Sequence, residues 1–118
     1  MAKQIVTILG VVFLLIGVWG FFQNPILGLF AVDTVHNIVH LASGALALVF
    51  AARGEEGART YAKIFGVVYA LVTVLGLLMG EGELLGIMNI NGADNLLHLL
   101  LAAVLLYAGY GSRSRAMA

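Results

Sequence analysis

The chain has 118 residues, with six basic and six acidic side chains and a formal net charge of zero. Hydrophobic residues make up 62% of it and charged residues only 10%, and its mean hydropathy is +1.05. Soluble domains carry about 25% charged residues, so this composition excludes a soluble enzyme, a disordered tail and a nucleic-acid binder with a basic patch, and leaves an integral membrane protein.

Four apolar stretches are long enough, or nearly so, to cross a bilayer as helices of roughly 20 residues each. Their continuous apolar character favours helices over barrel strands, in which lipid-facing residues alternate with polar ones. We therefore predict an all-α fold, a single transmembrane domain over residues 1–118 that forms an up-down-up-down four-helix bundle. The predicted helices span about residues 5–22, 33–52, 61–79 and 91–110.

The segments that flank the predicted helices have distinct expected roles. The first helix is expected to be retained and not cleaved as a signal peptide, because no small-residue cleavage site follows it. Arg53 to Gly57 is expected to form a solvated turn. The two mildly apolar connections, residues 26–32 and 80–92, are expected to lie on the outer membrane surface as caps.

Charge is divided between the two sides of the predicted bundle. The basic residues all fall on one side: Lys3, Arg53, Arg59, Lys63, Arg113 and Arg115. The connections on the other side contain acids and no Lys or Arg; the acids are Asp33, Glu81, Glu83 and Asp94. The positive-inside rule therefore predicts that the N- and C-termini are cytoplasmic.

The two halves of the chain, about residues 5–52 and 61–110, resemble each other. Residues 8–12 read ILGVV where residues 64–68 read IFGVV, and residues 37–41 read NIVHL where residues 95–99 read NLLHL. Each half contains two spans, so both halves have the same orientation. A pseudo-twofold axis along the membrane normal is expected to relate the two tandem hairpins.

A stripe of polar residues marks the start of the second and fourth predicted helices. Spacings of four and three residues place its members on one helix face. They are Asp33, Asn37 and His40 in the first half and Asn91, Asn95 and His98 in the second, with His36 and Asp94 at a further matched position. Asp33 and Asn91 also suit helix N-caps. His40 is roughly 10 Å along the axis from Asp33, so the stripe enters only the outer third of the bilayer.

The leading interpretation of this stripe is structural. Polar side chains inside a membrane need partners, and interhelical hydrogen bonds provide them. His40 and His98 are expected to bond an Asn amide or a backbone carbonyl of the other hairpin and so to lock the two together. The chain is then a non-enzymatic protein with a structural, accessory or assembly role, in contact with the lipid bilayer and with a homo-oligomer or larger membrane complex, but with no nucleic acid.

The alternative interpretation is ligand binding. Two histidines at equal depth, His40 and His98, suit haem b between bundle helices, and one of them suffices for a chlorin. A divalent metal ion is the other candidate, because three imidazoles and a carboxylate suit zinc or iron. Its expected ligands are His36, His40, Asp94 and His98. The chain contains no cysteine, which excludes thiolate ligands. A small oligomeric transporter is a third alternative. A transporter should have polar residues along the inner halves of the helices, and the inner halves here lack them.

Two motifs carry a family resemblance: Asp33-x-x-His36-Asn37-x-x-His40-Leu41-x-x-Gly44 and Ala93-Asp94-Asn95-x-x-His98-Leu99. They resemble a bacterial family of small four-span membrane proteins known as domain of unknown function 4383. The resemblance covers most of the chain, from the first predicted helix to the fourth. It implies a four-helix protein of the bacterial cytoplasmic (inner) membrane, and it implies no activity.

Overall fold

The computed structural model describes residues 1–80 and 82–111. This part of the chain forms four α-helices: α1 (Ala2–Phe22), α2 (Thr34–Ala52), α3 (Glu55–Met79) and α4 (Gly92–Leu106), which continues as the π-helix η1 (Tyr107–Gly111). Each helix, with η1 counted as part of the fourth, is long and apolar enough to span a membrane. The expected charges at Glu81, Arg113 and Arg115 lie outside the described residues.

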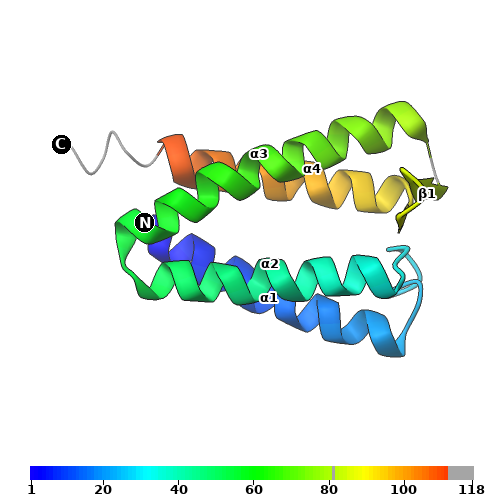
Figure 1. The fold of residues 1–118 in the computed structure, drawn as a ribbon, viewed down its shortest axis with the longest axis horizontal. Helices are drawn as coiled ribbons and strands as arrows, with labels where there is room; N and C mark the ends of the chain where they lie inside the picture. The colour runs from blue at the N-terminus through cyan, green and yellow to red at the C-terminus, as the bar shows by residue number, and fades with distance from the viewer. Residues whose placement is uncertain (81, 112–118) are drawn as a thin grey trace.

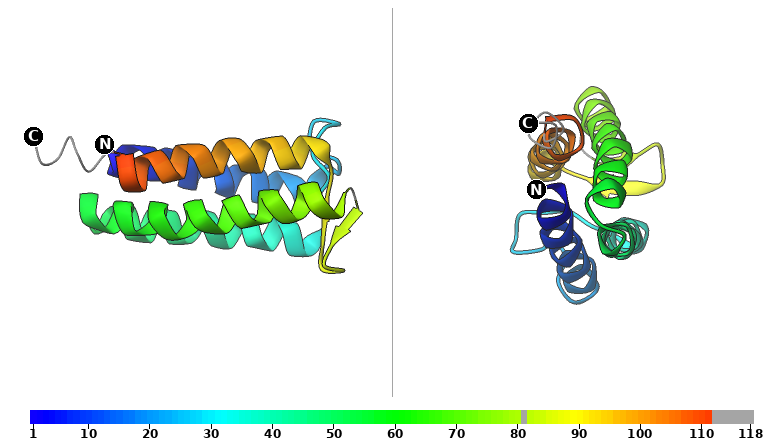
Figure 2. Two further views of the ribbon diagram at one scale, coloured as in Figure 1. Left: turned by 90° about the horizontal axis from the view of Figure 1, so that it is seen from above. Right: turned by 90° about the vertical axis from the view of Figure 1, so that its left-hand side faces the viewer.

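The helices are arranged as two hairpins. The most extensive helix contacts are those of α1 with α2 and of α3 with α4, and the two pairs lie side by side (Figures 1 and 2). Both long connections, described over residues 23–33 and 82–91, lie at the same end of the bundle, here called the loop end. The short α2–α3 connection and the start of α1 lie at the opposite end, here called the turn end (Figure 1).

Side-chain caps fix the starts of α2 and α4. The Oδ1 atom of Asp33 accepts a hydrogen bond from the backbone N–H of His36 at 2.9 Å. In the same way Asn91 accepts from the N–H of Asp94 at 2.9 Å, and the Asp94 carboxylate accepts from the N–H of Asn91 at 3.0 Å. The N-cap predictions for Asp33 and Asn91 are therefore confirmed.

Helix α3 begins at Glu55, earlier than the sequence pattern predicts. Two acids in the first turn, Glu55 and Glu56, suit the positive end of the helix dipole. Both also pair with Arg59, whose guanidinium lies 2.8 Å from Glu56 and 3.8 Å from Glu55. The expected solvated turn over residues 53–57 was therefore too long, because its two acids are part of the helix.

The connection between α3 and α4 contains a small antiparallel hairpin that the sequence analysis did not predict. Strand β1 (Gly82–Leu84) pairs with β2 (Met88–Ile90). At the turn, Leu85 and Gly86 adopt left-handed conformations, with φ values of 54° and 71°. This hairpin covers part of the loop end of the bundle (Figure 1).

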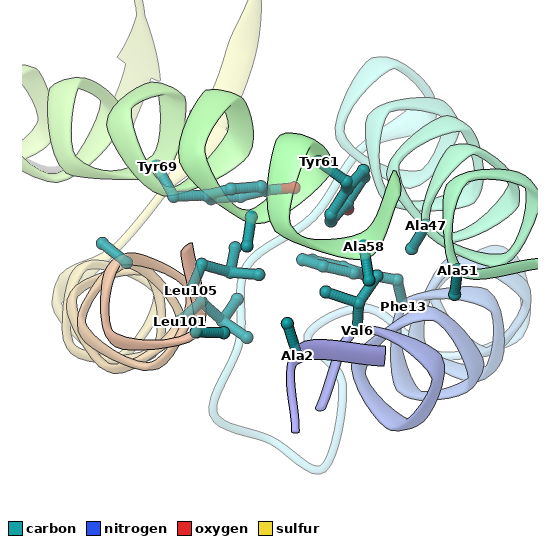
Figure 3. Packing of buried hydrophobic residues seen from close by; sticks show 13 residues of the cluster. Ala2, Val6, Phe13, Ala47, Ala51, Ala58, Tyr61, Tyr69, Leu101 and Leu105 are labelled. Atoms are coloured by element: carbon teal, nitrogen blue, oxygen red, sulfur yellow. The ribbon is translucent and has the colours of Figure 1, made fainter. Parts of the chain in front are cut away.

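Buried apolar side chains from all four helices and η1 form the core (Figure 3). They are Ala2, Val6, Phe13, Ala47, Ala51, Ala58, Tyr61, Ala62, Tyr69, Leu101, Ala102, Leu105 and Ala108. The Phe13 and Tyr69 rings stack at 5.3 Å between centroids. Many large apolar side chains instead face outward, including Leu15, Leu71 and Leu78. An apolar exterior over a small-residue core suits helices surrounded by lipid.

Candidate functional site

All three histidines of the chain meet at the loop end of the bundle. His36 and His40 lie on successive turns of α2, and His98 lies on the second turn of α4. All three side chains are buried, with at most 2% of each residue exposed. One potential ligand nitrogen from each lies within 4.8 Å of the other two. We call this group the histidine triad.

A backbone hydrogen bond sets the tautomer of His36. Its Nδ1 atom lies 2.8 Å from the carbonyl oxygen of Asn89 in β2. Because a carbonyl oxygen only accepts, Nδ1 carries the hydrogen and donates it, and Nε2 keeps the lone pair. That Nε2 is buried and has no hydrogen-bond partner among the described residues. His36 therefore presents an unused acceptor inside the protein.

The other two histidines also have a nitrogen without a partner. Within residues 1–80 and 82–111, the Nδ1 atoms of His40 and His98 are both buried and make no hydrogen bond. The interhelical bonds expected of these histidines are therefore not made at Nδ1. Leaving a buried polar group unpaired costs about 1–3 kcal/mol. Each imidazole of the triad thus has a buried nitrogen that no described residue satisfies.

Asp33 and His36 together hold the backbone of Asn89. The Oδ2 atom of Asp33 accepts a hydrogen bond from the Asn89 N–H at 2.9 Å, while His36 donates to the Asn89 carbonyl. Both polar groups of this residue's backbone are thus bound to the start of α2. We call this arrangement the Asn89 clamp. It fixes β2 beside the histidine triad.

A cavity of about 80 Å³ adjoins the triad. Its walls come from α2, α3, α4 and β2, and are formed by His36, Val39, His40, Ser43, Phe65, Val68, Tyr69, Val72, Met88 and His98. The hydroxyl groups of Ser43 and Tyr69 hydrogen-bond to each other at 2.9 Å. Ser43 follows His40 by three residues, so the helix period places it on the same face. Neither Tyr69 nor Met88 was predicted from the sequence to belong to the site.

The predicted site residue Asp94 is buried but does not belong to the triad. Its Oδ2 atom accepts the hydrogen bond from the backbone N–H of Asn91 at the start of α4, and its Oδ1 atom is buried without a hydrogen-bond partner among the described residues. The Asn91 side chain in turn donates to the carbonyl oxygen of Leu29 at 2.8 Å. These two residues therefore connect the start of α4 with the α1–α2 connection.

The two asparagines of the predicted polar stripe pack within their own hairpins. Asn37 lies against Gly20 of α1, and Asn95 lies against Gly76 of α3. A Cβ atom at either glycine would collide with the asparagine side chain. Both asparagines are buried. Their position indicates a role in helix packing, whereas the histidines meet between the hairpins.

Comparison with known proteins gives one family match. The model described as domain of unknown function (DUF4383) matches residues 3–111. No curated protein and no solved structure matches the chain significantly. The matched range includes α1 from Lys3 onward, the other three helices and the histidine triad. It confirms the resemblance that the two sequence motifs indicate, and the description carries no activity.

Proposed function

The chain belongs to the family described as domain of unknown function (DUF4383), and we propose that it is a multi-pass membrane protein whose histidine triad holds one transition-metal ion. One observation carries this proposal: three buried imidazoles, each with an unpaired nitrogen, have potential ligand atoms within 4.8 Å of one another. Neutral imidazole is a good ligand for zinc, copper, iron and nickel.

The distances suit a metal ion after a small movement. Zinc–nitrogen bonds of about 2.0–2.1 Å place neighbouring ligands of a tetrahedral site about 3.4 Å apart. The triad atoms, within 4.8 Å of one another, reach this spacing by closing up to about 1.4 Å. The hydrogen bond from His36 to Asn89 also supports the proposal, because metal-binding histidines donate their second N–H to a carbonyl or carboxylate.

The size of the cavity favours an ion over a haem or a chlorin. Sites for small organic ligands have volumes of about 300–1,000 Å³. The cavity beside the triad measures only about 80 Å³. The ring centroids of His40 and His98 are 6.2 Å apart, and those of Tyr69 and His98 are 5.5 Å apart. A metal ion with one or two waters fits this space, and a macrocycle does not.

The proposed role of the ion is accessory and non-enzymatic. His36 and His40 belong to one hairpin and His98 to the other, so a shared ion cross-links the two. A ligand that binds only the folded state stabilises that state. The expected histidine lock between the hairpins is then a metal ion and not a pair of direct hydrogen bonds.

We further propose that the two hairpins are a duplicated unit related by a pseudo-twofold axis. The α1–α2 connection has Leu27 and Gly28 at φ 56° and 71°, close to the 54° and 71° of Leu85 and Gly86. A second parallel is the contact of a glycine with an asparagine inside each hairpin, Gly20 with Asn37 in the first and Gly76 with Asn95 in the second. These parallels support an up-down-up-down bundle with helices α2 and α4 in equivalent places.

The first test is the metal content of the protein. Full-length chain without a polyhistidine tag is purified in mild detergent, exposed to Zn²⁺ and freed of excess ion. We expect about one metal ion per chain and no haem absorption band. His98→Gln and His40→Gln are expected to lose the ion, and the wild type is expected to unfold at a higher temperature with metal than without it.

Asp94→Asn is the matched control, because it changes a buried polar residue of the same helix that lies outside the triad. It is expected to keep the full metal content. A wild-type protein that binds no ion, or a His98→Gln variant that binds as much as the wild type, would contradict the proposal. A stoichiometric haem band that disappears in both histidine variants would replace the ion with a tetrapyrrole.

A further inference from the structure

The cavity beside the histidine triad contains one more potential metal ligand, the thioether of Met88. The other side chains that line it are apolar, apart from the three imidazoles and the hydroxyls of Ser43 and Tyr69. These hydroxyls already hydrogen-bond to each other, and the Ser43 carbonyl accepts from Tyr61 at 2.8 Å. Among the described side chains that line the cavity, Met88 alone supplies a soft sulfur donor, which makes it the candidate for a fourth coordination position.

Met88 is held in place by its neighbour in the chain. Asn89 is fixed to the start of α2 by the Asn89 clamp, through 2.9 Å and 2.8 Å hydrogen bonds to its N–H and C=O. Strand pairing with Leu84 restrains Met88 from the other side of β2. The residue next to the clamp thus lies at the wall of the cavity, on a different element from any of the histidines.

The charge of the site favours a monovalent ion. No side chain that lines the cavity carries a formal charge when the imidazoles are neutral. A divalent ion leaves two positive charges in a membrane-embedded interior, where unpaired charge is costly. The carboxylate of Asp33 accepts hydrogen bonds from the backbone N–H groups of His36 and Asn89, and it supplies one negative charge next to the site. A single positive charge on the ion needs less compensation than two.

From these observations we propose that the site is selective for Cu(I), coordinated by His36, His40, His98 and the thioether of Met88. Soft thioether ligands suit Cu(I), whereas protein zinc sites are built from thiolate, imidazole and carboxylate ligands. This inference rests on the proposed metal site and specifies its ion and a fourth ligand. Met88 becomes a metal ligand that joins the β1–β2 hairpin to both helical hairpins.

The test compares Met88→Leu with the wild type for two ions. Tag-free, full-length protein in detergent competes with a chromophoric Cu(I) chelator under anaerobic, reducing conditions, and with a fluorescent chelator for Zn²⁺. We expect Met88→Leu to weaken Cu(I) binding about ten-fold or more and to change Zn²⁺ binding by less than about three-fold. X-ray absorption of the Cu(I)-loaded wild type should show sulfur coordination that the variant lacks.

Met79→Leu is the matched control, since Met79 is exposed at the loop end of α3 and does not line the cavity. It should leave both affinities unchanged. Equal Cu(I) affinity in Met88→Leu and the wild type, or copper without sulfur coordination, would overturn the inference. If the wild type binds Zn²⁺ and His98→Gln does not, the proposed metal site stands even though the Cu(I) inference has failed. If neither ion binds the wild type, the metal site itself is wrong.

Discussion

At the scale of single residues, Asp33 links a helix start to the site. One carboxylate oxygen caps α2 through the N–H of His36, and the other binds the N–H of Asn89. The adjoining His36 completes the hold on Asn89. Asp33 therefore positions both a triad histidine and the strand that carries Met88, although it does not line the cavity itself.

Asp33→Ala is expected to lower the free energy of unfolding by about 1–3 kcal/mol, because it removes an N-cap and a second hydrogen bond. The backbone N–H of Asn89 should also lose its protection from hydrogen exchange. Asp33→Asn should have a smaller effect, since it keeps one acceptor for the cap. Unfolding in detergent and amide exchange measured by mass spectrometry provide the two readouts.

Asn91→Ala is the control for this experiment, because Asn91 caps α4 and makes no bond to Asn89. It should destabilise the protein to a similar extent while the Asn89 amide stays protected. A protected Asn89 amide in Asp33→Ala would show that the clamp does not hold the strand.

The sequence predicted part of the site at this scale. The spacing of His36 and His40 placed two imidazoles on one side of α2, and the repeat placed His98 opposite them. Asp94 was expected beside them for the same reason, but its carboxylate turns to the start of α4 and binds the N–H of Asn91. Met88 belongs to an irregular connection whose path no helical period describes, so its place at the cavity required the structure.

At the scale of elements, glycines allow α1 and α2 to approach each other closely. A Cβ atom at Gly44 of α2 would lie 2.7 Å from the carbonyl oxygen of Gly10 and 2.9 Å from the backbone nitrogen of Leu14 in α1. Backbone atoms cannot turn aside as side chains do. The contact between α1 and α2 therefore depends on the missing side chain at Gly44.

Gly44→Ala is expected to destabilise the protein by about 1–3 kcal/mol, because the added methyl group forces α1 and α2 apart. Val49→Ala serves as the comparison, since Val49 lies on the same helix and is 53% exposed. It should change the unfolding temperature in detergent much less. Equal unfolding temperatures for Gly44→Ala and the wild type would show that the two helices are free to separate.

The limits of sequence reasoning are clearest at element boundaries. The apolar stretches located all four helices, because spans of this length have few alternatives. The start of α3 was missed because Glu55 and Glu56 precede the apolar stretch, in the segment that was expected to form a solvated turn. The strands β1 and β2 were missed because each has only three residues, which is too short for an alternating pattern to stand out.

At the scale of the whole molecule, basic side chains near the turn end support one orientation in the membrane. Lys3 lies near the start of α1, and Arg53 lies at the end of α2. Lys63 lies 5.5 Å above the ring of Tyr110, near the end of η1. The positive-inside rule then favours a cytoplasmic turn end and an external loop end that carries the histidine triad.

This orientation can be tested with single cysteines, because the chain contains none of its own. Leu27→Cys in the α1–α2 connection should react with a membrane-impermeant thiol reagent in intact cells of a bacterial host. Ala52→Cys at the end of α2 should react only after the cells are broken. Both positions are exposed in the structure. The opposite labelling pattern would invert the proposed orientation.

The Asn89 clamp has a consequence for how the sequence of this connection can change. The bonds reach the N–H and C=O of residue 89, which every amino acid except proline supplies. Substitutions in its side chain therefore leave the two bonds intact, while Asp33 and His36 must keep their chemistry. The side chain of residue 89 is therefore free to diverge while the strand keeps its position over the cavity, and a proline at this residue removes the N–H from which Asp33 accepts a hydrogen bond.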